Sequence, residues 1–182
     1  LRKHKCQKYI IDAGKRVYNK TNTLFNFDGA KAMLSLNTII NTINTLGEGR
    51  FNSEIKTVCI IGDGYAFFSN LLRQINPSIK VISINLGKTL LFDVLYSKVC
   101  FPEINTALIR SIKDKELILK NELSFIEAEN YHLLEDLPID MFVNSASMQE
   151  INPEIIEKYF EYMRKSSSST PYFYCCNRIK KS

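Results

Sequence analysis

The sequence has no long uninterrupted hydrophobic run and no C-x-x-C pair, and it contains only two histidines. A membrane-spanning helix needs about 20 consecutive apolar residues, and a secretory signal needs a positively charged start before a short apolar core. Because neither is present, we expect a cytoplasmic protein with no transmembrane segment. The five cysteines show no C-x-x-C spacing and three of them lie in apolar runs, so we expect buried, reduced thiols. No pair of thiols lies near His4 or His132, so we expect no metal site.

A basic binding face is also missing from the middle of the sequence. Ten of the 24 Lys and Arg residues lie in the first 20 or the last five positions, which leaves 14 basic against 18 acidic residues between them. Nucleic-acid binding needs clustered positive charge, so we do not expect it of the central part of the chain. The basic N-terminal residues could still contact an anionic partner.

The length of the chain fits one domain with a hydrophobic core. We expect a basic N-terminal arm over residues 1–27, a core over 28–177 and a basic tail over 178–182. The chain begins at Leu1 rather than Met, and it ends soon after an apolar run typical of a core strand. These two features indicate a fragment of a longer protein.

Five apolar runs of strand length alternate with patterns typical of helices. The expected strands are Val58–Ile61, Ile79–Asn85, Leu123–Ala128, Ile139–Asn144 and Tyr172–Cys176. No hairpin turn sequence joins any two of them, so we expect the strands to pair in parallel, with helices on both faces of the sheet. The predicted fold class is therefore α/β, with a Rossmann-like parallel sheet.

Helices are expected between these strands, because apolar residues recur there at spacings of three and four. The expected helices are Asp28–Gly47, Tyr65–Ile75, the segment after Gly87 and the segment that starts at Asn152-Pro153-Glu154. The segment 101–119 is less regular. Within it, Leu108, Ile109 and Ile112 favour one further helical piece.

The turn Gly62-Asp63-Gly64 joins the first expected strand to a helix. Glycine at both positions allows a sharp turn and lets a ligand approach the backbone closely, although the same residues could simply make a tight turn. A dinucleotide site would need a third glycine where the sequence has Phe67. A nicotinamide-dependent oxidoreductase is therefore the weaker interpretation of this turn.

Polar residues follow the other expected strands, at the sheet edge where ligands of open α/β proteins bind. Asn85 ends the second strand, Glu129 and Asn130 follow the third, and Asn144 and Ser145 lie at the end of the fourth. Glu129 and Asn130 could equally belong to a solvated loop. The abrupt change from apolar to polar residues at Asn144 favours a functional role there.

Two segments carry a resemblance to a known family. Val58–Ser69 resembles the first motif of class I S-adenosylmethionine-dependent methyltransferases, and Asp140–Glu150 resembles their fourth. The second segment, the helix start at Asn152 and the segment Tyr172–Asn177 are also similar to sugar O-methyltransferases of bacterial polysaccharide clusters. The resemblance covers about Phe27–Asn177. The sheet of this family ends in an antiparallel hairpin, so the resemblance implies a core that lacks these last two strands.

The resemblance implies S-adenosylmethionine as the cofactor. In the family pattern, Gly62-Asp63-Gly64 would surround its methionine part, and Tyr65 would line the pocket unless its ring packs in the core. Asn85 takes the place of the acid that binds the ribose hydroxyls, and an amide can both accept from and donate to a diol. Glu129 and Asn130 would lie near the adenine.

The resemblance also implies a reaction, which is methyl transfer to a sugar hydroxyl in polysaccharide or glycan biosynthesis. Asn144 and Ser145 would lie beside the reacting sulfonium, and the acceptor would be a sugar or glycan. A carboxylate or an imidazole could remove the hydroxyl proton. Glu150 is the first candidate for this base and His132 the second.

Three departures from the family pattern keep another function open. Ile60 stands where many relatives carry an acid, Ala66 replaces a glycine, and Asn85 lacks the charge of the usual ribose-binding acid. The main alternative is therefore a catalytically inactive cofactor-binding or interaction domain of the same fold. No pattern in the sequence predicts an oligomeric state.

Overall fold

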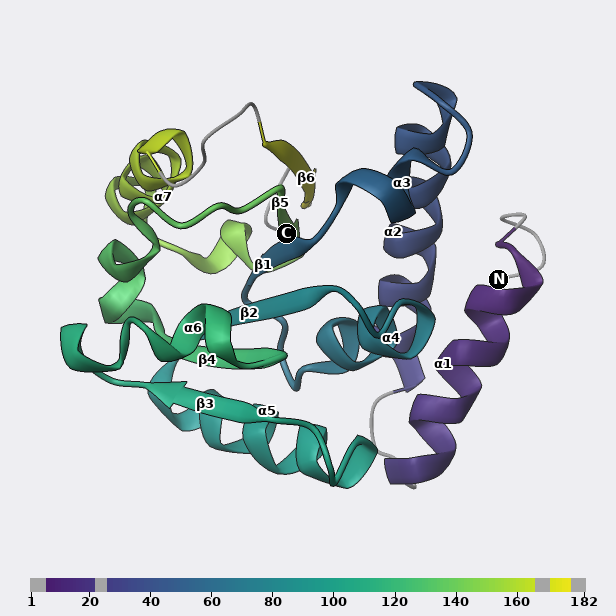
Figure 1. The fold of residues 1–182 in the computed structure, drawn as a ribbon, viewed down its shortest axis with the longest axis horizontal. Coiled ribbons are helices and arrows are strands. Elements are labelled where there is room, and N and C mark those ends of the chain that lie inside the picture. Colours follow the sequence, from purple (N-terminus) through teal and green to yellow (C-terminus); the bar gives the residue numbers. More distant parts are fainter. Residues whose placement is uncertain (1–5, 22–25, 166–170, 178–182) are drawn as a thin grey trace.

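The computed structural model describes residues 6–21, 26–165 and 171–177. Six strands form one sheet in the order β3-β4-β2-β1-β5-β6, and all of the pairings are parallel (Figure 1). The strands are β1 Thr57–Ile61, β2 Lys80–Asn85, β3 Thr106–Ile109, β4 Leu123–Glu127, β5 Met141–Ser145 and β6 Tyr172–Cys176. The predicted α/β class with a Rossmann-like parallel sheet is confirmed.

The predicted helices are present, and the structure adds α1 in the N-terminal segment and several short helices. The α-helices are α1 Lys8–Thr21, α2 Asn26–Thr45, α3 Arg50–Glu54, α4 Phe67–Ile75, α5 Gly87–Cys100, α6 Leu117–Lys120 and α7 Pro153–Lys165. The 3-10 helices are η2 Ile112–Asp114, η3 Ala128–Leu134 and η4 Met148–Glu150. The expected basic tail, residues 178–182, lies outside the described residues.

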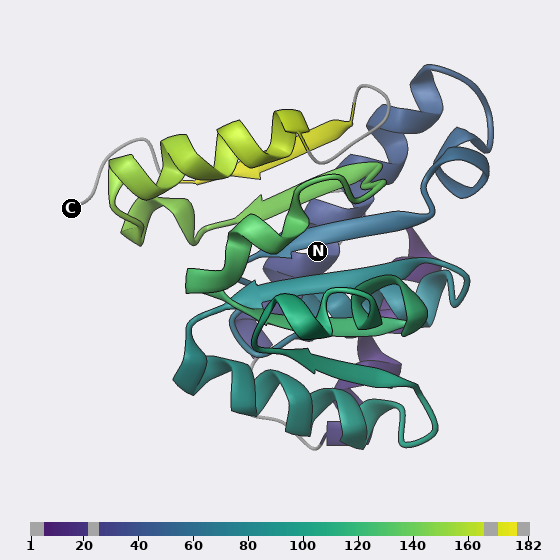
Figure 2. The same cartoon turned by 60° about the vertical axis from the view of Figure 1, so that its left-hand side comes forward.

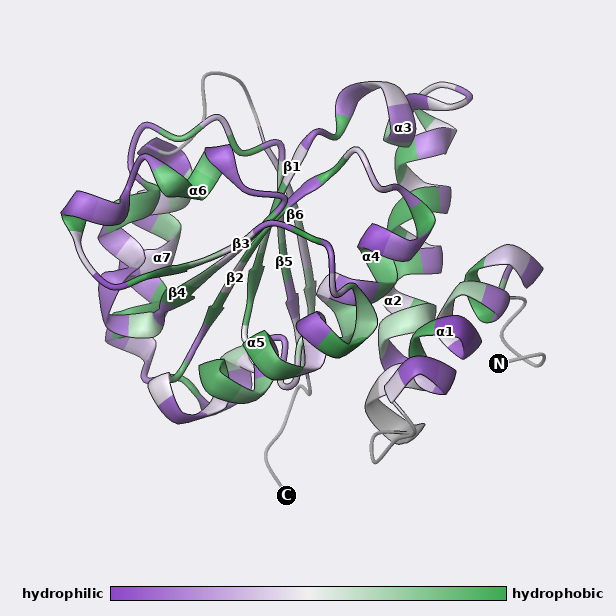
Figure 3. Ribbon diagram, turned by 60° about the horizontal axis from the view of Figure 1, so that its bottom comes forward, coloured by the Kyte–Doolittle hydropathy of each residue, from purple (hydrophilic) through white to green (hydrophobic). Residues whose placement is uncertain are grey.

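Helices cover both faces of the sheet, as the apolar strands predict (Figures 2 and 3). Val58 and Ile60 of β1 pack in one core with α1, α2, α4 and α5, whereas Cys59 and Ile61 pack in a second core with η3 and α7. Successive side chains of a strand point to opposite faces, so the continuous run in β1 is buried on both sides.

Strand β3 corrects the expectation of a helical piece around Leu108 and Ile109. Ala107 and Ile109 are buried against the second core, while Leu108 between them is exposed. This alternation has the two-residue period of a strand, and Thr106–Ile109 pairs in parallel with Leu123–Ile126 of β4. The sheet therefore has a sixth strand at the edge beyond β4.

Helix α1 lies within the segment that we expected to be a basic arm. Ile10, Ala13 and Val17 are fully buried in the core that also contains α2 and α4. Their spacing of three and four residues places them on one helix face, and the charged residues of the segment occupy the other. Residues 8–21 thus contribute to the packed structure.

Helix α5 buries a face that mixes apolar and polar residues. Leu90, Asp93, Ser97 and Cys100 are buried, and the buried stripe therefore contains an acid and a hydroxyl. The apolar residues on the other side of the helix are exposed; these are Leu91, Phe92, Leu95 and Val99. Tertiary contacts rather than amphipathic patterning therefore set the rotation of this helix.

Strand β1 lies at the point where the chain changes sides. It pairs with β2 on one side and with β5 on the other. The helices α4 and α5, which follow β1 and β2, cover one face, whereas η3 and α7, which flank β5 in sequence, cover the other. Ligands of open α/β sheets bind at such a switch point, beyond the carboxyl ends of the strands.

Among the described residues, no helix has the length and apolar character to span a bilayer.

Candidate functional site

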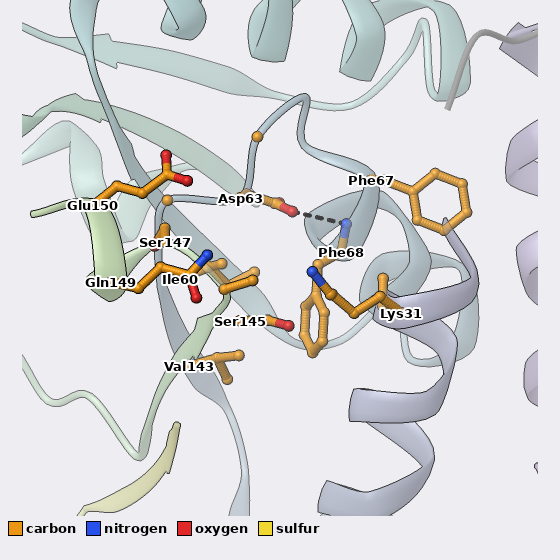
Figure 4. Close-up of a pocket in the computed structure, with 14 residues that line it drawn as sticks. Lys31, Ile60, Asp63, Phe67, Phe68, Val143, Ser145, Ser147, Gln149 and Glu150 are labelled. Atoms are coloured by element: carbon orange, nitrogen blue, oxygen red, sulfur yellow. Dashed lines mark hydrogen bonds between the residues drawn. The ribbon is translucent and has the colours of Figure 1, made fainter. Parts of the chain in front are cut away.

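Two cavities open on the two sides of the turn Gly62-Asp63-Gly64. The first, here called the β5 cavity, has a volume of about 390 Å³ and lies between the turn, the end of β5 and α2 (Figure 4). The second, here called the β2 cavity, has a volume of about 610 Å³ and lies between the turn, the end of β2, η3 and the start of α7. Both are lined by Gly62, Gly64, Ser147 and Glu150. The cavities therefore meet at the turn.

The backbone of the turn needs its glycines. Gly62 has φ 72° and Gly64 has φ 79°, in the left-handed region that other residues rarely adopt. A Cβ on Gly62 would collide with the side chain of Ser147, whereas a Cβ on Gly64 would meet nothing within 4 Å. The Gly62 N–H also donates to the Ile84 carbonyl of β2 at 2.8 Å. Gly62 is therefore packed tightly against Ser147 and has no room for a side chain, whereas Gly64 faces open space at the cavities.

We expect Gly62→Ala to destabilise the protein by on the order of 3 kcal/mol, because it adds overpacking against Ser147 to left-handed backbone strain. Urea unfolding measures this loss. Adding Ser147→Gly removes the colliding atoms, so the double variant should recover part of the lost stability. A single variant as stable as the wild type would contradict the close approach of Gly62 and Ser147.

The Asp63 carboxylate is bound to the start of α4, and the residue also lines the β5 cavity. It accepts hydrogen bonds from the backbone N–H of Phe68 at 2.9 Å (Figure 4), and from the N–H of Ser69 at 2.8 Å and the Ser69 hydroxyl at 2.5 Å. Burial nevertheless raises the pKa of Asp63 to about 6, against the opposing effect of these bonds. Asp63 thus fixes the turn to the helix that follows it.

Asn85 lies at the edge of the β2 cavity with its amide held on both sides. Its Nδ2 donates to the Gly64 carbonyl at 3.2 Å and to Asp93 Oδ2 at 3.0 Å, and its Oδ1 accepts from the Leu86 N–H at 3.0 Å. Both amide protons are therefore engaged, and one lone pair of Oδ1 remains. Toward a ligand Asn85 can only accept, which corrects the expectation that it could also donate.

Asn144 is fully buried and joins β5 to its neighbours. Its Nδ2 donates to the Ile61 carbonyl at 2.8 Å and to Ser147 Oγ at 2.5 Å, while its Oδ1 accepts from Met148 N at 3.2 Å and from Asn177 Nδ2 at 2.9 Å. All four hydrogen-bonding positions of the amide are occupied. Asn144 therefore supports the site from behind, although we expected it beside the cofactor.

The remaining predicted binding residues divide between cavity and surroundings. Ser145 lines the β5 cavity, with its hydroxyl 3.3 Å from that of Ser35 in α2. Tyr65 and Glu129 line the β2 cavity. Asn130 lines neither cavity, and its Nδ2 donates to the Arg110 carbonyl at 3.2 Å. The structure thus brings Ser145, Tyr65 and Glu129 to the cavities and leaves Asn130 outside.

The two candidate bases also separate. Glu150 is exposed and lines both cavities at their junction. His132 is exposed and lines neither, because η3 turns its neighbours Leu133 and Leu134 into the core. Of these two residues, Glu150 therefore lines the cavities and His132 does not.

Some lining residues come from elements that sequence reasoning did not connect with the site. Lys31 of α2 extends toward Phe68 and Asp63 at the β5 cavity (Figure 4), and Gln149 lines the same cavity. Tyr131 and Tyr159 line the β2 cavity. The α2 helix precedes β1 in sequence, so only its packing across the turn brings Lys31 to the site.

No family model and no curated protein match the chain. Among solved structures, mitomycin 7-O-methyltransferase aligns with 96% of this chain and 50% of its own length, with a TM-score of 0.50 and 8% identity. The fold is that of the class I methyltransferases. At this identity the likeness extends to the fold alone.

Two further solved structures are similar. One is a protein of Methanococcus maripaludis assigned as an S-adenosyl-L-methionine-dependent methyltransferase, with a TM-score of 0.47, 16% identity and coverage of 92% of this chain and 64% of that one. The other is magnesium protoporphyrin IX methyltransferase of Synechocystis PCC 6803 with bound S-adenosylhomocysteine, with a TM-score of 0.45, 11% identity and coverage of 88% and 64%. The chain therefore spans 50% to 64% of the length of these three proteins.

Proposed function

We propose that this chain binds S-adenosylmethionine and forms the cofactor-binding part of a methyltransferase that modifies a sugar or glycan hydroxyl. The observation that carries the proposal is the meeting of two cavities at a glycine turn, at the switch point of a class I methyltransferase fold. The β2 cavity would hold the nucleoside, and the β5 cavity would hold the amino-acid half of the cofactor and the acceptor, with the reacting groups at the junction of the two cavities.

The β2 cavity fits the nucleoside half of the cofactor. Ile84, Ile155 and Tyr159 supply apolar and aromatic surface for a flat base. The Asn85 Oδ1 retains a lone pair at the strand end, where it can accept a hydrogen bond from a ribose hydroxyl. Glu129 adds a carboxylate at the exposed edge that can accept from an exocyclic amine. This combination supports adenosine as the bound group.

The turn and the β5 cavity fit the amino-acid half. The open space at Gly64 permits close approach to the backbone, and Lys31 supplies a cation on the facing helix for a carboxylate. When bound, S-adenosylmethionine supplies a methyl group on a positively charged sulfur. The residues that line both cavities would then surround this methyl group; they are Gly62, Gly64, Ser147 and Glu150.

The acceptor side of the β5 cavity is predominantly polar. Ser145, Gln149 and Glu150 offer hydroxyl, amide and carboxylate groups, which suit an acceptor rich in hydroxyls. Glu150 would orient the acceptor hydroxyl and accept its proton, while the walls of the cavity hold the oxygen in line with the methyl group. These features support a sugar rather than a flat apolar acceptor.

Phe67 disfavours a dinucleotide in this site. Its ring lies so close to α2 that a Cβ on Gly29 would come within 3.0 Å of it, and the ring also lines the β5 cavity. Phe67 thus stands at the start of α4, where the dinucleotide fingerprint has its third glycine for close helix packing. A cofactor without phosphate avoids this conflict.

Calorimetric titration with S-adenosylhomocysteine, S-adenosylmethionine and NAD tests the cofactor. We expect both sulfur nucleosides to bind and NAD not to bind, and binding of NAD alone would overturn the proposal. Release of S-adenosylhomocysteine with a panel of monosaccharides, nucleotide sugars and oligosaccharides then tests the acceptor. Cofactor binding without turnover on any sugar would favour the catalytically inactive binding domain.

We expect Glu150→Gln to lower the turnover number about 100-fold while leaving the Kd for S-adenosylhomocysteine within about twofold, because it removes a proton acceptor and keeps the shape of the side chain. Glu154→Gln is the matched control, since Glu154 is an exposed acid on the adjacent α7. His132→Gln tests the second candidate base. A larger loss of turnover in this variant than in Glu150→Gln would reverse the assignment.

A further inference from the structure

The rotation of α5 places the acid Asp93 behind the β2 cavity. Asp93 is fully buried, although Leu91, Phe92 and Leu95 on the same helix are exposed. A different rotation of the helix would bury more apolar surface and leave the carboxyl in water, which hydrophobic burial alone would favour. The observed rotation therefore points to a specific partner for Asp93.

That partner is Asn85. Asp93 Oδ2 accepts from Asn85 Nδ2 at 3.0 Å, and the buried Ser83 hydroxyl of β2 also faces the carboxyl and acts to lower its pKa. Burial first and the nearby charge of Asp63 second raise the pKa of Asp93 to about 8, so the carboxyl is largely protonated at neutral pH. A neutral carboxyl still offers an acceptor oxygen, so the bond to Asn85 does not require the charged form.

The bond to Asp93 determines which end of the Asn85 amide a ligand meets. With Nδ2 turned to Asp93 and to the Gly64 carbonyl, the remaining lone pair of Oδ1 is the group left for the cavity. The same Nδ2 holds the carbonyl of Gly64, which lines both cavities. The contact between Asp93 and Asn85 thus orients the Asn85 oxygen that can accept a hydrogen bond from a ligand. It also stabilises the glycine turn.

We propose that Asp93 is a positioning residue for the nucleoside, which acts by holding the Asn85 amide so that its oxygen faces the β2 cavity. This inference rests on the proposed function. Asn85 thus provides an uncharged hydrogen-bond acceptor at the end of β2, and the acid that holds it, Asp93, lies behind it on α5. Asp93 lines neither cavity, so its effect on binding would pass through Asn85.

The first test compares S-adenosylhomocysteine affinity in three variants. Asp93→Ala should raise the Kd about tenfold, since one orienting hydrogen bond is lost. Asp93→Asn keeps an acceptor oxygen and should stay within about threefold of the wild type. Ser124→Ala is the matched control, because it removes a buried hydrogen bond to the Ile118 carbonyl far from the turn, and its Kd should not change. A wild-type Kd in folded Asp93→Ala would overturn the inference.

The second test exchanges the two side chains. At pH 9, above the pKa of Asp93, Asn85→Asp alone sets two carboxylates against each other and faces the Gly64 carbonyl with an oxygen, so its affinity should fall at least tenfold. Asn85→Asp with Asp93→Asn restores a donor between the positions and should recover most of the affinity. A double variant as weak as the single one would contradict the role of the pair.

Amide hydrogen exchange without ligand separates this inference from the proposed function. Loss of the Asn85 anchor should increase the exchange rate of Tyr65 and Ala66 in Asp93→Ala but not in Ser124→Ala. If the wild type binds no S-adenosylhomocysteine, the proposed function fails, and the exchange rates still test the hold of Asp93 on the turn. If the wild type binds and neither affinity nor exchange responds to Asp93→Ala, only the inference on Asp93 fails.

Discussion

Replacing Gly64 by valine should abolish binding of S-adenosylhomocysteine while the protein remains folded. Nothing lies within 4 Å of the place where a Cβ would stand, so the new side chain has room and projects into the space that both cavities share. The space that accommodates the valine would be taken from the ligand. Calorimetric titration should show a loss of affinity of at least 100-fold, with the unfolding transition retained.

Gly49 provides a matched control for this experiment. It has φ 72°, close to the φ of 79° at Gly64, and a Cβ there would likewise meet nothing within 4 Å. Gly49→Val therefore adds similar backbone strain at the start of α3, remote from the cavities. We expect both variants to lose similar stability and only Gly64→Val to lose binding. Equal affinity in the two variants would refute the placement of the pocket at the turn.

The glycine turn could be predicted because its signals are local. A buried apolar strand, two glycines and a helical pattern follow one another within Thr57–Ile75, and the structure forms them in that order. The polar strand ends were also visible, since parallel strands bring their carboxyl ends to one edge. Sequence patterns of this kind show which segments reach the site, but not which atoms face it.

The roles of Asn85 and Asn144 required the tertiary structure. Both follow apolar strands in the same manner, yet Asn85 retains one lone pair at a cavity and Asn144 has none left. Strand β3 was missed because four residues are too few to reveal a period of two. Asp93 was missed because its environment comes from β2 and the turn, which lie before α5 in sequence.

Asp93 should also make the stability of the free protein depend on pH. Its pKa rises from the ordinary 3.8 to about 8 in the folded state, so between these values the folded protein binds a proton that the unfolded chain releases. Stability falls with rising pH wherever the folded state binds more protons. The free energy of unfolding should therefore decrease from about pH 4 to about pH 8, by on the order of a few kcal/mol. Asp63, with its pKa raised to about 6, adds to the decrease in the lower part of this range.

Asp93→Asn isolates this effect, because the amide resembles the protonated carboxyl and does not titrate. Near pH 4 the variant should be about as stable as the wild type, and at pH 9 it should be the more stable of the two. Urea unfolding of both proteins across this range gives the difference curve, in which the contributions of carboxylates that do not interact with Asp93 cancel; Asp63 interacts with it and contributes to the curve. A difference that is constant with pH would show that Asp93 ionises in the folded protein as it does in the unfolded chain. Solvent or a nearby charge would then stabilise the ionised carboxyl. The inference of an uncharged Asp93–Asn85 pair behind the β2 cavity would be wrong.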